Sequence, residues 1–142
     1  MVTSKDCFKR FGNPEQENEL VLWRVSKYIP KSIPTIPSKI YCNKQMIVPL
    51  EVAFLNIIDR GLEDELKTWD GCFNVRRKRG CKSWSLHSWA IAIDINAAWN
   101  GLDKIPQMSK ELVQCFTDAG FDWGGNWKRK DGMHFQLAYL TD

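Results

Sequence analysis

The chain contains only two histidines, and each lies near an aspartate in the sequence. His87 precedes Asp94 by seven positions, and His134 follows Asp131 by three. A carboxylate set between isoleucines, as Asp94 is, costs free energy unless a positive group meets it. Two imidazoles and one carboxylate, with a fourth position open for water, are a known ligand set of catalytic zinc. The residue types therefore predict a zinc site formed by His87, Asp94 and His134, with Asp131 beside the water.

Each of these residues also has a simpler interpretation when it is taken alone. A single histidine near a strand is more often a hydrogen-bonded core or surface residue, and an aspartate before a glycine is commonly only a turn residue. The metal hypothesis gains weight because both histidines of the chain have acidic neighbours at the ends of expected strands. Spacing alone leaves the two interpretations open.

Alternating side chains in the run 90–96 predict a strand that would carry the carboxylate. The residues expected to face the core are Ile91, Ile93 and Ile95. His87 is an odd number of residues from Asp94, so a continuous strand would put the two on opposite faces. We therefore expect a bend near Ser88 and Trp89. A turn at Gly132 would lead into a second strand that carries His134.

The remaining elements predict how these strands are supported. A polar-to-apolar segment from Pro14 to about Lys27 predicts a helix, and the proline-rich stretch 28–42 predicts an extended surface strap. Further helices are expected from Pro49 to a cap at Gly61, and from Ser109 to Gly120. Helices do not alternate regularly with strands, which favours an α+β fold with a small antiparallel sheet and packed helices. The expected strands are 68–75, 90–96 and 134–140.

Length and composition predict one domain over residues 1–142, with the helix and strap in 1–48 and a catalytic core in 49–142. No apolar run approaches the roughly 20 residues of a membrane span. The first twenty residues lack the apolar stretch of a secretory signal, so we expect a product made in the cytoplasm. The five cysteines form no CxxC pair, and a bridge between Cys72 and Cys81 is left open.

The formal net charge of +3 is mild, and much of it comes from the run 76–79. Such a run is usually a solvated loop, so no nucleic-acid partner is expected.

Two segments of the sequence resemble a known family. SLHSWAIAIDIN and GFDWGGNWKRKDGMHFQL are similar to the signature blocks of the zinc peptidases that comprise D-alanyl-D-alanine carboxypeptidases and L-alanyl-D-glutamate endopeptidases. These blocks read SxHxxGxAxD and a WGG segment followed by DxMHF. The likeness covers about residues 71–137, and GCFNVRRKRG resembles the arginine-bearing strand upstream. It implies the fold shared by these peptidases and the amino-terminal domain of hedgehog proteins.

The resemblance assigns roles to the residues that match the blocks. It implies that His87, Asp94 and His134 bind Zn²⁺ and that Asp131 is the general base, which takes a proton from the attacking water and passes it to the leaving amine. One position departs from the pattern, because the glycine three residues after the first histidine is Ala90 here. Alanine fits an extended strand but would be strained at positive φ.

The same resemblance points to residues that would contact the substrate. Arg76 lies where the family has an arginine that holds the substrate and stabilises the oxyanion, and Arg77 is the candidate if the register slips by one. Ser85 is either a strand-end hydroxyl or a hydrogen-bonding group for substrate or ligand. Trp89 is a candidate wall of a peptide groove, although core packing is the simpler role for the tryptophans of these blocks.

The function implied by the resemblance is hydrolysis of the peptidoglycan stem peptide. Small single-domain members resemble phage endolysins that cleave between L-Ala and D-Glu, so we expect a monomer that reaches the cell wall after release by a holin-type partner. A D-alanyl-D-alanine carboxypeptidase is the alternative. A third hypothesis is a zinc-stabilised binding module without catalysis. Asp131 argues against it, because a structural site needs no unliganded acid beside an open position.

Overall fold

The computed structural model describes residues 1–142 and has two antiparallel sheets with helices packed on them. The first sheet pairs β1 (Leu20–Arg24) with β2 (Lys39–Asn43). The second has four strands in the order β3-β4-β6-β5. Their bounds are β3 (Trp69–Gly71), β4 (Ala92–Ile95), β5 (Phe121–Trp123) and β6 (His134–Leu137). The predicted α+β class with a small antiparallel sheet is confirmed.

Strands β4 and β6 form the centre of the larger sheet, and their register decides where the chemistry lies. Asp94 and His134 are directly opposed Cα partners in this antiparallel pair. Side chains at opposed positions point to the same face with Cβ atoms roughly 5 Å apart. The isoleucines at positions 91, 93 and 95 are fully buried, as the alternation predicted. The sheet therefore presents the carboxylate and one imidazole together on the face away from the isoleucines.

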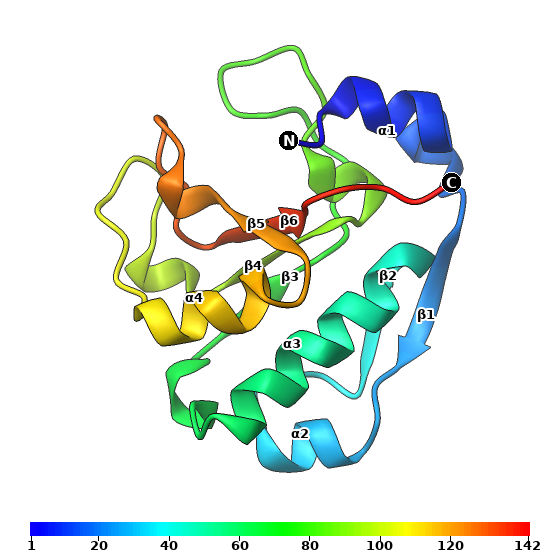
Figure 1. Ribbon diagram of the computed structural model, residues 1–142. Coiled ribbons are helices and arrows are strands. Elements are labelled where there is room, and N and C mark those ends of the chain that lie inside the picture. Colours follow the sequence, from blue (N-terminus) through cyan, green and yellow to red (C-terminus); the bar gives the residue numbers. More distant parts are fainter.

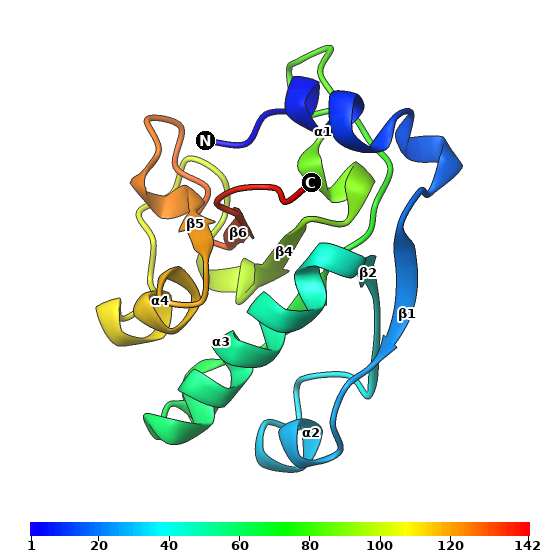
Figure 2. The same cartoon turned by 45° about the vertical axis from the view of Figure 1, so that its right-hand side comes forward.

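Four helices complete the fold: α1 (Ser4–Phe11), α2 (Tyr28–Ser32), α3 (Ile47–Asp59) and α4 (Lys110–Thr117). Figures 1 and 2 show α3 crossing the molecule between the β1–β2 pair and the larger sheet with α4. Phe54 of α3 stacks on Trp23 of β1 at 6.4 Å between ring centroids and meets Trp69 of β3 edge-on at 5.9 Å. One aromatic side chain thus joins the two sheets through the helix.

The two helices with clear periodicity are confirmed. At the end of α3, Gly61 has a φ of 70°, and the backbone N–H of Leu62 donates to the carbonyl of Ile57. This is a glycine-terminated helix end of the Schellman type. The hydroxyl of Ser109 accepts from the backbone N–H of Leu112 and caps α4, as expected.

The amino-terminal third differs from the prediction. The helix expected from Pro14 to Lys27 is wrong: only residues 14–16 form one 3₁₀ turn, and β1 follows. Glu17 and Glu19 both have positive φ, which ends helical geometry. The strap is partly wrong, because α2 contains Pro30. Proline is tolerated there because the first helical turn needs no backbone N–H donor.

Strand lengths were also overestimated, since each of the three predicted strands is represented by only three or four residues. The core is nevertheless continuous: 29 buried apolar residues form one cluster that runs in sequence from Val2 to Leu137. No helix is both long enough and apolar enough to span a bilayer.

Candidate metal centre and catalytic cavity

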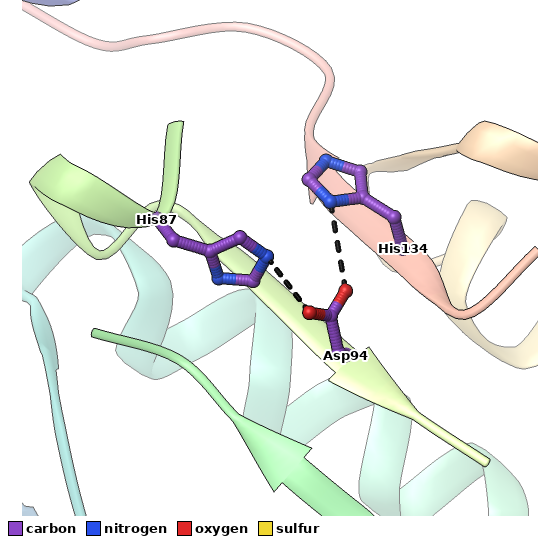
Figure 3. A group of neighbouring side chains, drawn as sticks. All are labelled: His87, Asp94 and His134. Atoms are coloured by element: carbon purple, nitrogen blue, oxygen red, sulfur yellow. Dashed lines mark ion pairs between the residues drawn. The ribbon is translucent and has the colours of Figure 1, made fainter. Parts of the chain in front are cut away.

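His87, Asp94 and His134 converge at the centre of the larger sheet. One ligand atom from each lies within 4.8 Å of the others. Asp94 comes from β4, His134 from the neighbouring β6, and His87 from the 3₁₀ turn Leu86–Trp89 that precedes β4. Figure 3 shows both imidazoles directed at the carboxylate of Asp94, one toward each oxygen. Three residues that span 48 positions of sequence thus face one point.

The bend predicted between His87 and Asp94 is present and ends at Ala90. This residue has φ 53° and ψ 39°, the left-handed region, and its N–H donates to the carbonyl of His87 at 3.0 Å. The extended conformation considered for Ala90 is therefore wrong. A glycine would adopt this geometry without strain, while alanine pays roughly 1–2 kcal/mol for it. The left-handed residue turns the chain so that His87 lies on the same side of the sheet as Asp94.

The hydrogen bond of His87 leaves one nitrogen free for a metal. Its Nδ1 lies 2.7 Å from the carbonyl oxygen of Cys72 and donates to it, because a carbonyl only accepts. The lone pair of Nε2 then points at Asp94 Oδ2, 3.1 Å away. Two lone pairs cannot share a hydrogen bond, and both His87 Nε2 and Asp94 Oδ1 are buried without a partner. Such orphaned acceptors are what an ion between them would satisfy.

His134 is oriented in the same way through its other nitrogen. Nε2 lies 3.0 Å from Oε1 of Gln136 and donates to it, which leaves Nδ1 unprotonated at 3.6 Å from Asp94 Oδ1. The amide of Gln136 donates in turn to the carbonyl of Val2 at 3.1 Å. No role was assigned to Gln136 from the sequence. The spacing of two along a strand was the signal that could have shown it.

These distances fit a zinc ion. Ligand bonds of about 2.1 Å in a tetrahedral arrangement put neighbouring ligand atoms about 3.4 Å apart. The separations are 3.1 Å from His87 Nε2 to Asp94 Oδ2 and 3.6 Å from His134 Nδ1 to Asp94 Oδ1, one to each carboxylate oxygen, and both lie close to this value. Neutral imidazoles, each with its second N–H bound to an oxygen, are the usual form of histidine ligands. The donor set therefore fits Zn²⁺ with a fourth position free.

In the absence of an ion, Asp94 and the two histidines stabilise each other's charged forms. Burial opposes the ionisation of Asp94, but the imidazoles of His134 and His87, which can donate to its carboxylate once they are protonated, outweigh it, so the pKa of Asp94 lies well below its usual range. Burial likewise opposes protonation of His87, and the carboxylate of Asp94 more than offsets this, so the pKa of His87 is raised. The site thus attracts positive charge, whether a proton or a metal ion.

Asp131 lies next to the cluster without joining it. Its Oδ2 is 3.9 Å from Nδ1 of His134, too far for a hydrogen bond. Burial raises the pKa of Asp131 above its ordinary value, and the nearby His134 only partly offsets this. An acid whose pKa is moved toward neutrality is a better proton acceptor. Asp131 is thus an unliganded carboxyl group beside the cluster, where a proton acceptor could act on a bound water.

The WGG segment holds Asp131 in place through close backbone packing. The N–H of Asp131 donates to the carbonyl of Gly124 at 3.0 Å. A Cβ on Gly124 would lie 2.5 Å from the carbonyl oxygen of Asp131, and one on Gly125 would lie 2.2 Å from the ring of Trp123. Both positions therefore require glycine. Gly132 has no positive φ, so the turn predicted there needs glycine for the close approach of Pro106, not for its dihedrals.

A cavity of about 370 Å³ opens over the cluster. Asp94, Asp131, His134, Ser85 and Arg76 line it together. The backbone of Arg76 is anchored on both sides, because its N–H donates to Ser88 Oγ at 3.1 Å and its carbonyl accepts from the N–H of Ser85 at 2.8 Å.

The structure also separates Arg76 from its neighbour. The guanidinium of Arg77 lies 3.8 Å from the ring centroid of Trp84 and donates to the carbonyl of Lys82, and Arg77 does not line the cavity. Of the two candidates, Arg76 and Arg77, only Arg76 lines the cavity.

Two further predicted residues have different outcomes. The hydroxyl of Ser85 accepts from the N–H of His87 at 3.3 Å and caps the turn, and Ser85 also lines the cavity. Trp89 departs from the substrate-binding prediction. Its ring is buried, its Nε1 donates to the carbonyl of Gly12 at 2.8 Å, and it does not line the cavity. The aromatic wall is instead Trp127, whose ring lies 5.2 Å from that of His134.

All five cysteines are unpaired thiols. Cys72 is buried and Cys81 is exposed, so no disulfide joins them. Burial raises the pKa of the Cys42 thiol to about 12. The cysteines therefore take no part in the metal cluster, apart from the backbone carbonyl of Cys72.

Comparison with known proteins agrees with this geometry. Residues 79–137 match the family model of D-alanyl-D-alanine carboxypeptidases, which confirms the resemblance to these zinc peptidases. The match includes both histidines, Asp94 and Asp131. No curated protein and no solved structure gave a significant match.

Proposed function

We propose that this chain, with its match to the D-alanyl-D-alanine carboxypeptidase family, is a zinc-dependent peptidase that hydrolyses the L-alanyl-D-glutamate bond of the peptidoglycan stem peptide. The observation that carries the proposal is the combination of two buried, unpartnered acceptors on His87 and Asp94 with an unliganded Asp131 at the same cavity. The first feature fits a metal. The second is needed only for catalysis.

The residues of the cavity divide the work of hydrolysis. A bound zinc ion supplies a Lewis acid at the open corner of the cluster. Asp131 accepts the proton of the attacking water and delivers it to the leaving amine. Arg76 holds the substrate and places its fixed positive charge where negative charge develops on the scissile carbonyl. The ring of Trp127 forms one wall of the cavity beside His134.

The choice of bond rests on the resemblance to small endolysin-type members of the family. The protein would act at the bacterial cell wall as a monomer, after release by a holin-type partner. Removal of the terminal D-Ala is the alternative activity, and the description of the matched family favours it. A zinc-stabilised module without catalysis would retain His87, Asp94 and His134 but would have no use for Asp131.

The test is digestion of defined muropeptides, with mass spectrometry of the released fragments. We expect a free L-Ala end and a fragment that begins with D-Glu. Loss of one terminal D-Ala would instead establish the carboxypeptidase.

An Asp131→Asn variant serves as the matched control, because it has nearly the same shape and lacks the base. It should bind zinc as the native protein does and lose at least a hundredfold in rate. If the variant digests peptidoglycan as fast as the parent, the assignment of Asp131 is refuted. If neither protein digests any substrate while both bind zinc, the binding-module hypothesis replaces the enzyme.

A further inference from the structure

Cationic side chains gather on the rim of the catalytic cavity beyond the one arginine used above. Lys78, Arg79 and Arg129 line the same cavity as Asp94 and Asp131. Neither Lys78 nor Arg79 has a carboxylate within 4.0 Å, so neither is paired within the chain. Arg129 meets Asp103 at 3.6 Å, but both side chains are more than half exposed, and such a pair is weak in water. The cavity lining therefore carries positive charge on Lys78 and Arg79 that no carboxylate of the chain pairs with, and on Arg129 only a weakly paired charge.

These cations come from two loops that hold each other in position. In the segment 77–84 the N–H of Lys78 donates to the carbonyl of Ser83 at 2.8 Å, and the N–H of Cys81 donates to the carbonyl of Lys78 at 3.1 Å. Gly80, with φ 71°, closes this turn. The guanidinium of Arg129, from the loop between β5 and β6, donates to the carbonyl of Arg79 at 2.9 Å. In Figure 1 the green loop of residues 72–85 arches beside the amino terminus.

We infer that Lys78, Arg79 and Arg129 form a second anion subsite that binds a carboxylate of the peptide substrate away from the scissile bond. The inference rests on the proposed function. It narrows the substrate class to stem peptides that have a free carboxylate able to reach these three side chains. Arg76 serves the scissile bond, so the subsite is a specificity determinant separate from the catalytic residues.

The shared cavity identifies the ligand as part of the substrate. Because Arg79 and Arg129 line the same 370 Å³ cavity as the metal cluster, a peptide held at the cluster can reach them with a second group. A peptide carboxylate matches a guanidinium in two parallel hydrogen bonds, which makes the contact selective as well as attractive. Replacing a carboxylate by an amide removes the charge and one acceptor with little change in shape. Amidation of the substrate is therefore the natural discriminator.

The experiment compares three synthetic tetrapeptides, L-Ala-γ-D-Glu-L-Lys-D-Ala and its two mono-amides, one at the D-Glu α-carboxyl group and one at the carboxyl terminus. For the native zinc-loaded protein we expect kcat/KM to fall roughly tenfold for one of the two mono-amides, the size expected for a charge-assisted hydrogen bond. In an Arg79→Gln/Arg129→Gln double variant the parent should fall to the level of that amide, and the preference should disappear.

The matched control is Lys82→Gln/Lys128→Gln. These exposed lysines lie in the same two loops and carry the same total charge, but they do not line the cavity. The control should keep the full preference, because a general loss of positive charge acts on all three peptides through screened, long-range attraction. Equal loss of preference in the control and the double variant would overturn the subsite.

A binding measurement separates this inference from the proposed function. Calorimetric titration of the zinc-loaded Asp131→Asn variant with the same peptides reports affinity without turnover. Suppose that the unamidated peptide binds more tightly than one mono-amide, but that the native protein cleaves none of the three peptides. The subsite then stands and the proposed activity fails. If all three peptides bind equally, the subsite is overturned whether or not the native protein is a hydrolase.

Discussion

Replacement of Gln136 by methionine tests whether the hydrogen bond that orients His134 contributes to the metal affinity. Gln136 is almost fully buried and makes two side-chain hydrogen bonds, as acceptor from His134 and as donor to the carbonyl of Val2. Methionine has nearly the same length but only a weak sulfur acceptor. The change therefore removes the partner of the His134 N–H while leaving the volume of the core almost unchanged.

The structure sets the expected size of the effect. Loss of the group that orients a histidine ligand typically weakens metal binding 10- to 100-fold, or about 1.4–2.7 kcal/mol. Stability falls as well, because the N–H of His134 and the carbonyl of Val2 are left buried without partners, at about 1–3 kcal/mol each. At this chain length each kcal/mol corresponds to roughly 3–4 °C in Tm.

Zinc affinity is measured by competition with a chromophoric chelator, and stability by thermal unfolding of the metal-free protein. Gln136→Glu is the informative control, since a carboxylate still accepts from His134 but cannot donate to Val2. It should lose stability and keep zinc affinity, whereas Gln136→Met loses both. If Gln136→Met binds zinc with native affinity, the orientation of His134 does not depend on Gln136 and the reasoning is refuted.

Three further predictions follow from the same geometry. The free energy of unfolding of Ala90→Gly, measured by denaturant titration, should lie within about 1 kcal/mol of the native value, because relief of left-handed strain offsets the lost methyl group and the freer unfolded chain. The control Ala92→Gly, in extended backbone, should lose about 1–2 kcal/mol. The metal-free protein should lose stability as pH rises from about 6.5 through the raised pKa of His87. It should also lose stability as pH falls below about 3.9 toward the lowered pKa of Asp94. Calorimetry of Asp94→Asn at the same pH values should show neither change. Chelation of zinc present at a thousandfold excess over its Kd should remove about 4 kcal/mol of stability and all hydrolysis, with both restored by added zinc but not by magnesium.

The candidate metal ligands were predicted chiefly by the family resemblance, and Asp94 stood out in addition because a carboxylate breaks the apolar pattern of its strand. A carboxylate inside an alternating strand such as 90–96 needs a partner, and the only two histidines were available to supply it. The helices α3 and α4 were predictable because apolar periodicity and end signals agreed. Where one signal stood alone, as at Pro14, it reported a single turn and not a helix. The capping box of Thr3 and Asp6 was the better signal, and it marks α1.

Backbone geometry explains most of what the sequence did not reveal. No pattern of residue types predicts positive φ at Glu17 or Glu19, because these side chains are compatible with ordinary conformations. At Ala90 the only signal was the glycine that the family pattern has at this position. The glycines of the WGG segment are visible as letters, but their reason is close packing that no Cβ permits, with Asp131 against Gly124 and the ring of Trp123 against Gly125. Trp89 shows the converse: its place in the motif predicted a groove, whereas burial and a hydrogen bond to Gly12 make it part of the core.

The orientation of the two imidazoles depends on parts of the chain far from either signature block. His87 is held by the carbonyl of Cys72 at the end of β3, and His134 is held through Gln136 by the carbonyl of Val2 near the amino terminus. Carbonyls carry no sequence signature, so no motif can report these contacts. They have a thermodynamic consequence, because a metal that binds better to oriented imidazoles must in return stabilise the segments that orient them. Zinc binding should therefore protect the backbone amides around residues 1–4 and 71–74 from hydrogen exchange. Neither segment contains a ligand. Protection confined to the ligand-bearing strands would therefore show that metal binding does not stabilise the segments that carry the two carbonyls.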